Sequence, residues 1–271
     1  MAEDMLSQIL LDRPLDCAEM EGFLFALAER YALPVQVIGN SLSGKAIRAV
    51  CLGDPLLREE TKMEFAAVYI GGMADGDWIS TAILLRFLRD YCVFRAEERR
   101  LYGVHLPYLW KNRTIYVIPN ANPDGMHVKK QDAAIRARPA SMRIQGGFLP
   151  GAPFAGTENA AISPEVAGVC QFLQFTPTRL CVALSAENAD PAVATAVDCP
   201  DRAVTIGKLL SHMASWPFTR TEAPNSLAAW YTAAMRRPAF QVYLGPDRSE
   251  VGYYYGYAAM REVLFSAPLL L

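Results

Sequence analysis

Two acidic residues follow an apolar segment that ends in two glycines, in the stretch "VYIGGMADGDWIS" at residues 68–80. Asp75 and Asp77 stand just before a predicted helix, and Glu187 follows another apolar run much later in the chain. Three carboxylates gathered at one edge of a sheet would suit magnesium, calcium or manganese rather than zinc. The alternative, which we favour, is that Asp75 and Asp77 cap the helix that begins near Trp78. A carboxylate there satisfies the first free amides and complements the helix dipole.

Other residue types that carry chemistry lack suitable neighbours in the sequence. None of the three histidines has a partner at metal-ligand spacing; they are His105, His127 and His212. Ser185 has no histidine nearby to act as a base. The segment "GNSLSG" at 39–44 departs from the Gly-x-Ser-x-Gly elbow, and "GGFLPGAPFAG" at 146–156 lacks the Lys-Ser/Thr ending of a phosphate loop. These segments therefore predict neither a serine hydrolase nor a nucleotide site.

Short β-rich runs alternate with segments of helical periodicity along the chain. The predicted strands cover residues 35–39, 46–53, 64–72, 114–120, 179–187 and 239–245. The predicted helices cover residues 17–31, 79–91, 163–175, 203–216, 226–237 and 250–265. Such alternation predicts a sheet covered by helices on both faces, with ligands bound beyond the carboxyl ends of its strands. Positions 74–77, 145–146, 185 and 243 follow predicted strands or lie near their ends, so we expect them on one rim.

Composition and charge exclude several classes of function. The chain has 271 residues and a formal net charge of -2, and it has no long basic block, so neither nucleic acid nor a membrane is expected as a partner. The acidic N-terminus does not resemble a secretory signal, and we predict a cytoplasmic location. Residues 1–16 are predicted to form an N-terminal extension and residues 17–271 a single domain. Four of the six cysteines lie in apolar segments and are expected to be reduced and buried: Cys51, Cys92, Cys170 and Cys181.

Four segments, in order and at suitable spacing, resemble the zinc carboxypeptidases of the carboxypeptidase A type. They are "IGNSLSGKAIRAVCLG" (38–53), "VYIGGMADGDWISTAILLRFL" (68–88), "VIPNANPDG" (117–125) and "RRPAFQVYLG" (236–245). Within that family the similarity is greatest to the bacterial γ-D-glutamyl-diaminopimelate peptidases. The resemblance implies one α/β/α domain with a mixed, mostly parallel, twisted sheet of about eight strands.

The same resemblance implies which positions would bind zinc and carry out hydrolysis. The family's first zinc His falls on Ala74, its zinc Glu on Asp77, its second zinc His on Ser185 and its general-base Glu on Tyr243. The Asn-Arg pair that binds the substrate's terminal carboxylate falls on Gln145-Gly146. Asp77 is therefore the only metal ligand of a retained type, and no base or guanidinium clamp is expected.

These substitutions predict a catalytically inactive pseudo-peptidase without zinc, although the family consists of peptide hydrolases. The rim, with Asp75, Gln145, Gly146, Glu187 and Tyr243, would bind a peptide or a partner protein. The first alternative is an active metallocarboxypeptidase or cell-wall-peptide peptidase with zinc in a non-standard site. The second is a structural subunit whose cleft is filled by its own side chains.

Overall fold

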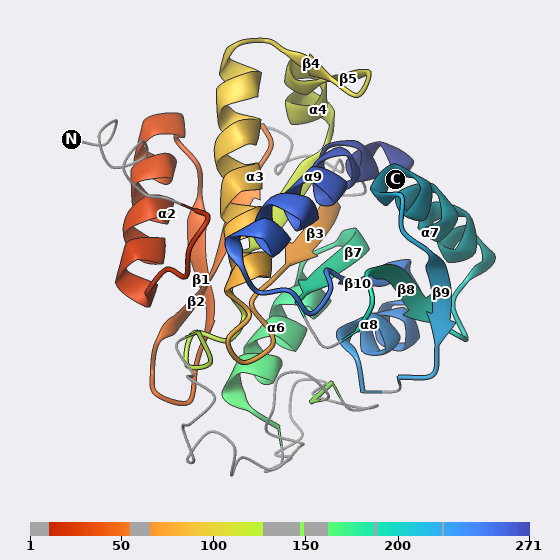
Figure 1. Ribbon diagram of the computed structural model, residues 1–271. Coiled ribbons are helices and arrows are strands. Elements are labelled where there is room, and N and C mark those ends of the chain that lie inside the picture. The colour runs from red at the N-terminus through yellow and green to blue at the C-terminus, as the bar shows by residue number, and fades with distance from the viewer. Residues whose placement is uncertain (1–10, 55–65, 127–146, 149–161, 187–188, 224) are drawn as a thin grey trace.

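The computed structural model describes residues 11–54, 66–126, 147–148, 162–186, 189–223 and 225–271 (Figure 1). Eight strands form one sheet in the order β1-β2-β6-β3-β7-β10-β8-β9. In that order the strands are β1 (Val35–Asn40), β2 (Ala46–Leu52), β6 (Thr114–Ile118), β3 (Ala66–Ile70), β7 (Thr178–Ser185), β10 (Ala239–Tyr243), β8 (Ala192–Ala196) and β9 (Phe218–Thr221). The central strands β6, β3, β7 and β10 run parallel, whereas the pairs β1–β2, β2–β6 and β10–β8 are antiparallel. The predicted mixed, mostly parallel sheet is confirmed.

Side chains of the central strands alternate between two separate hydrophobic cores, because successive residues of a strand point to opposite faces. On β3, Ala67 and Tyr69 belong to the larger core, whereas Val68 and Ile70 belong to the smaller one. The larger core is covered by α2 (Cys17–Tyr31), α3 (Trp78–Ala96), α4 (Leu106–Asn112), α7 (Asp201–Ala214) and α9 (Glu250–Ser266). The smaller core is covered by α6 (Pro164–Phe175) and α8 (Leu227–Met235). The domain thus has the α/β/α layering expected from the sequence.

Several elements were absent from the sequence-based prediction. They are the strands β8 and β9, the short helix α4, the hairpin of β4 (Arg100–Leu101) and β5 (Val104–His105), and the terminal 3₁₀ helix η4 (Ala267–Leu270). Strand β9 is half-exposed at the sheet edge and strand β8 contains only alanine, valine and threonine. Neither strand has the long apolar run on which a strand prediction from sequence depends.

Helix caps account for where two of the helices begin. Asp16 and Glu19 form a reciprocal capping box at α2, and Ser163 accepts a hydrogen bond from Val166 N at α6, with Pro164 in the first turn. The predicted start of α6 is therefore confirmed. Before α2, Leu11 and Leu15 are buried in the larger core, so the described part of the predicted extension packs on the domain.

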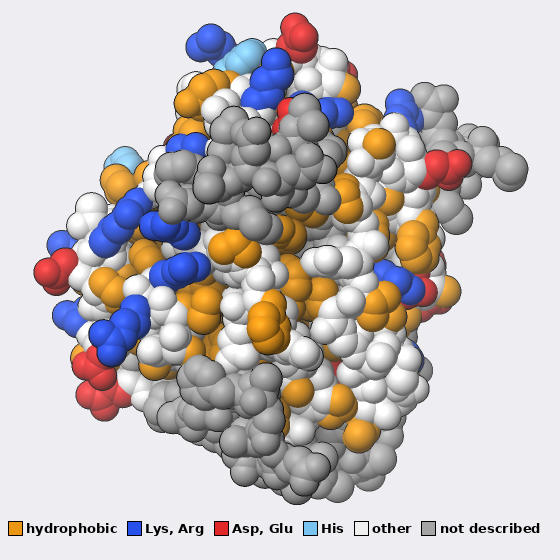
Figure 2. Space-filling view, turned by 180° about the vertical axis from the view of Figure 1, so that it is seen from behind, with side chains coloured by type: hydrophobic (Ala, Val, Ile, Leu, Met, Phe, Trp, Pro, Cys, Tyr) orange, Lys and Arg blue, Asp and Glu red, His pale blue; other side chains and the backbone are white. Residues whose placement is uncertain are grey.

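Figure 2 shows the face of the molecule opposite to that of Figure 1. Basic side chains lie mainly toward one side of this face, and acidic side chains lie among them. None of the helices in the described part of the chain combines the length and the apolar character that crossing a membrane requires.

Candidate functional site

Three parallel strands end at the same edge of the sheet and bring most of the predicted site positions together. Strand β7 lies between β3 and β10, and the Cα partners at its end are Ile70 with Ala183 and Tyr243 with Ser185. Ser185 and Tyr243 are therefore lateral neighbours, and the loop after Ile70 leaves the sheet beside them. The expected rim exists for the described residues, whereas Gln145, Gly146 and Glu187 lie outside them.

The loop from β3 to α3 is folded tightly at its glycines. Gly72 has a φ of +60°, and a Cβ there would lie 2.6 Å from both Asn120 Oδ1 and Thr81 Oγ1. Glycine adopts this conformation readily, and its lack of a Cβ leaves room for both neighbours. The amide of Gly72 donates a 2.7 Å hydrogen bond to Ser80 Oγ, which ties the loop to the first turn of α3.

Asp77 is the N-cap of α3, as predicted, and both its carboxylate oxygens are engaged. Oδ1 accepts a hydrogen bond from Ser80 N at 3.1 Å, and Oδ2 accepts bonds from Ser80 Oγ at 2.7 Å and Ala186 N at 3.0 Å. The side chain is buried, and this burial raises the pKa of Asp77 even though the hydrogen bonds and the charge of Arg248 act in the opposite direction. Both carboxylate oxygens of Asp77 therefore accept hydrogen bonds from within the protein.

Asp75 does not cap α3, which corrects the interpretation that both acids do so. Its side chain is exposed, and Oδ1 accepts a 2.9 Å hydrogen bond from Asn122 Nδ2. The α3 cap has room for one carboxylate, and Asp77 occupies it because Asp77 immediately precedes Trp78. Gly125 packs against this pair, since a Cβ there would lie 2.3 Å from Asn122 Nδ2 and 2.5 Å from Asp75 Oδ1.

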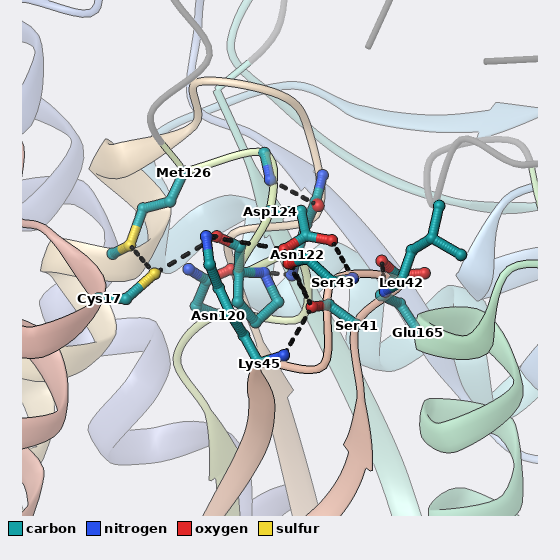
Figure 3. A network of polar contacts seen from close by, with 12 residues as sticks. Cys17, Ser41, Leu42, Ser43, Lys45, Asn120, Asn122, Asp124, Met126 and Glu165 are labelled. Carbon is teal, nitrogen blue, oxygen red and sulfur yellow. Dashed lines mark hydrogen bonds and ion pairs between the residues drawn. The ribbon is translucent and has the colours of Figure 1, made fainter. Parts of the chain in front are cut away.

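The turn at residues 123–125 holds the hairpin between β1 and β2 against the rim. Asp124 accepts hydrogen bonds from Ser41 Oγ at 2.9 Å, from Ser43 N at 3.0 Å and from Ser43 Oγ, and Lys45 Nζ lies 3.6 Å from Oδ1. Figure 3 shows the side chains of Ser41, Ser43 and Asp124 converging, with Lys45 beside them. Desolvation by burial acts to raise the pKa of Asp124, but the hydrogen bonds from both serines and the charge of Lys45 outweigh it and lower that pKa.

Arg248 was missed by the sequence-based reasoning and bridges two segments of the rim. Its Nη1 donates a 3.0 Å hydrogen bond to Asp75 O, and its Nη2 donates a 2.9 Å bond to Ala186 O. Its own main-chain oxygen accepts a 3.2 Å bond from Trp78 Nε1. All these partners involve main-chain oxygen atoms, which leave no signature in the residue types of a sequence.

The remaining predicted positions in the described residues are occupied by uncharged side chains. Ala74 is 7% exposed, Ser185 is fully buried and Tyr243 is half-buried. Among the described residues, no three histidine, cysteine, aspartate or glutamate side chains are grouped so that they could hold a metal ion. The proposed gathering of Asp75, Asp77 and Glu187 stays a prediction, because Glu187 is outside the described residues.

Comparisons with known proteins agree with this architecture. Residues 20–146 match the family model described as zinc carboxypeptidase. A γ-D-glutamyl-L-diamino acid endopeptidase from Lysinibacillus sphaericus is 29% identical over 91 residues, which cover 34% of this chain and 21% of that protein. The chain therefore matches only about a fifth of the length of this curated relative.

Solved structures share the fold over nearly the whole chain at low sequence identity. A metallo-carboxypeptidase from Burkholderia cenocepacia has a TM-score of 0.73 and 14% identity, covering 95% of this chain and 69% of that one. Carboxypeptidase A from Helicoverpa armigera has a TM-score of 0.68 and 12% identity, covering 97% and 76%. The murein-tripeptide amidase MpaA from Escherichia coli O157 has a TM-score of 0.55 and 17% identity, covering 88% and 94%.

Together, the sheet order, the two helical layers and these matches show an α/β domain with the fold of the metallo-carboxypeptidase structures. The resemblance to the zinc carboxypeptidases that the sequence predicts is confirmed.

Proposed function

We propose that this chain is a carboxypeptidase-like protein without zinc-dependent peptidase activity, which binds a peptide or a partner protein at the rim. The observation that carries the proposal is that the carboxylate of Asp77 is already hydrogen-bonded within the protein. Asp77 is the one acid at a position where the family resemblance places a zinc ligand. Both its oxygens accept hydrogen bonds from Ser80 and Ala186, so a metal would have to replace three protein donors.

The zinc that the family implies does not fit the other described positions either. Structural and catalytic zinc sites use thiolate, imidazole and carboxylate ligands. Ala74 has no donor atom, and Ser185 offers a buried neutral hydroxyl. Tyr243, at the position of the general base, carries a phenol whose ordinary pKa is near 10, far from that of a carboxylate base.

Binding at the rim is supported by groups that remain accessible there. Asp75 is exposed, and Arg248 is exposed although its guanidinium is fixed by two main-chain oxygens. A guanidinium has five N–H groups, so N–H donors of Arg248 remain for the carbonyl or carboxylate oxygens of a peptide. Carboxyl ends of parallel strands are also where α/β folds commonly bind ligands.

Two other functions retain some support. The fold and the family match favour an active metallopeptidase, whose substrate would be a peptide with a free terminus or a γ-D-glutamyl-diaminopimelate peptide. The burial of Ala74 and Ser185 favours a structural subunit, because ligand positions of an open site should face solvent.

A paired hydrolysis and binding experiment separates the three. The chain, with and without added zinc, is incubated with C-terminally free peptides and with γ-D-glutamyl-diaminopimelate peptides, and the Burkholderia cenocepacia enzyme serves as the positive control. Our proposal expects no turnover above the zinc-free blank, together with saturable peptide binding in calorimetry. Turnover that a chelator abolishes would establish the peptidase, and absence of both signals would favour the structural subunit.

A further inference from the structure

The guanidinium of Arg248 connects the end of β7 to the loop after β3, the two segments that the family's metal would connect. Its two hydrogen bonds reach Asp75 O and Ala186 O, at 3.0 and 2.9 Å. Asp75 directly follows Ala74, and Ala186 directly follows Ser185. The bridge therefore ends on the residues next to the two positions where the family resemblance places the zinc histidines.

Within the described residues, the positive charge of this bridge has no direct ion-pair partner. No carboxylate in the described part of the chain lies within 4.0 Å of the guanidinium, and both its hydrogen bonds go to neutral carbonyl oxygens. The buried carboxylate of Asp77 is linked to the same strand end, because it accepts a hydrogen bond from Ala186 N. The charge of Arg248 acts to lower the pKa of Asp77 and so favours its ionised carboxylate, although burial dominates and raises that pKa.

Arg248 is held in this position from both flanking helices. Trp78, the first residue of α3, donates from Nε1 to Arg248 O at 3.2 Å. The Trp78 indole stacks on Tyr253 of α9, with ring centroids 6.0 Å apart. On the other side, Ser249 caps α9 by accepting from Gly252 N. The guanidinium is thus placed by packed elements rather than by a free loop.

We propose that Arg248 takes the structural place of the metal in this fold, as a built-in cation that ties β7 to the loop after β3. This inference rests on the proposed function, because it assumes that zinc does not occupy the same place. It has two consequences. Without the guanidinium, the end of β7 and the loop after β3 should open more readily. With it, a metal placed between these two segments should bind more weakly.

Hydrogen exchange tests the first consequence. Arg248→Gln removes the charge and the two-armed bridge, Arg248→Lys keeps the charge alone, and Arg100→Gln is a control at an exposed arginine outside the rim. We expect amide exchange over residues 73–77 and 185–186 to accelerate about tenfold in Arg248→Gln and less in Arg248→Lys, as the loss of two ordinary hydrogen bonds implies. Strand β2 and the control should be unaffected. Unchanged exchange at the rim in Arg248→Gln would overturn the proposal.

Zinc competition tests the second consequence. The variant Ala74→His/Ser185→His is compared with the same variant carrying Arg248→Gln, and zinc affinity is measured against a chromophoric chelator. We expect at least about tenfold tighter zinc binding when Arg248 is absent, and equal affinities would contradict the proposal. If the double variant does not fold, the exchange result on the single variants decides. Zinc-dependent turnover by the unaltered chain would instead defeat the proposed function, so the two failures are distinguishable.

Discussion

The carboxylate of Asp77 accepts a 3.0 Å hydrogen bond from the main-chain nitrogen of Ala186, 109 residues further along the chain. This bond joins the start of α3 to the end of β7, which are the two elements that frame the rim. The acid at the position where the family resemblance places a zinc ligand is therefore part of the scaffold, and its removal should lower stability.

Replacing Asp77 by Ala should destabilise the fold by about 2 kcal/mol, since a helix cap is lost and the buried amide of Ala186 loses its acceptor. Urea unfolding measures this difference. The control is Ser163→Ala, which removes the ordinary cap of α6 and should cost about 1 kcal/mol. A loss at Asp77 no larger than at Ser163 would show that the link to Ala186 contributes little.

The charge of Asp77 predicts a particular pH dependence, which Asp77→Asn isolates. Burial raises the pKa of Asp77 above its ordinary value of 3.8, so between these values the folded chain binds more protons than the unfolded chain. The stability advantage of Asp77 over Asn is therefore greatest below the ordinary value and decreases as pH rises through the raised pKa. Unfolding free energies of both proteins across the acidic range test this sign. An advantage that grows with pH would contradict it.

Asp124 predicts the opposite sign, because its pKa is lowered and its side chain is only 7% exposed. Asp124→Asn should cost about 1–3 kcal/mol at neutral pH, when the ionised carboxylate accepts bonds from Ser41 and Ser43. That cost should shrink as pH falls through the lowered pKa. Lys45→Met is the control: its half-exposed ammonium should contribute less than about 1 kcal/mol. A pH-independent cost would indicate that the charge of Asp124 plays no part in its contact with the β1–β2 hairpin.

Gly125→Ala should displace the hydrogen bond between Asn122 and Asp75, because the new Cβ would lie within 2.5 Å of both side chains. Overpacking of this kind costs about 1–3 kcal/mol. The second variant is Asp75→Ala, which removes one of the two clashing groups. The double variant should be more stable than the sum of the single effects predicts, and strict additivity would mean that the clash is relieved elsewhere.

The cysteines predict a simple pattern of thiol reactivity. None of the six forms a disulfide; Cys17 and Cys199 are half-buried, and the other four are buried. Burial raises the pKa of Cys92 to about 12, which suppresses its thiolate at neutral pH. A chromogenic disulfide reagent should modify at most the two half-buried cysteines quickly in the native protein and all six after unfolding. Fast native modification of Cys92 would contradict the core described above.

The layered architecture was predictable because long apolar runs, such as the one ending in Gly71-Gly72, are typical of buried parallel strands. The resemblance of four ordered segments supplied the expectation of about eight strands. Strands β8 and β9 escaped prediction because their short segments, Ala-Val-Ala-Thr-Ala and Phe-Thr-Arg-Thr, carry weak periodicity. Helix α4 escaped because seven residues give too few turns for a periodic pattern.

The candidate site was predictable only where side-chain type carries the information. The capping role of Asp77 follows from the position of an acid just before a helix. The sequence alone could not show that Asp75, two residues earlier, does not share this role. Arg248 gave no signal, because its partners are main-chain oxygens brought together by the sheet. The cytoplasmic location and the peptide or protein partner stay predictions.

We propose that Asp77 belongs to the scaffold and holds no zinc ion. Elemental analysis of chain purified without chelators, re-exposed to excess zinc and desalted, measures the zinc content. We expect well under one zinc ion per chain, with no change on Asp77→Asn. One tightly held zinc ion per chain that is lost in Asp77→Asn would refute this proposal and establish a metal centre at the rim.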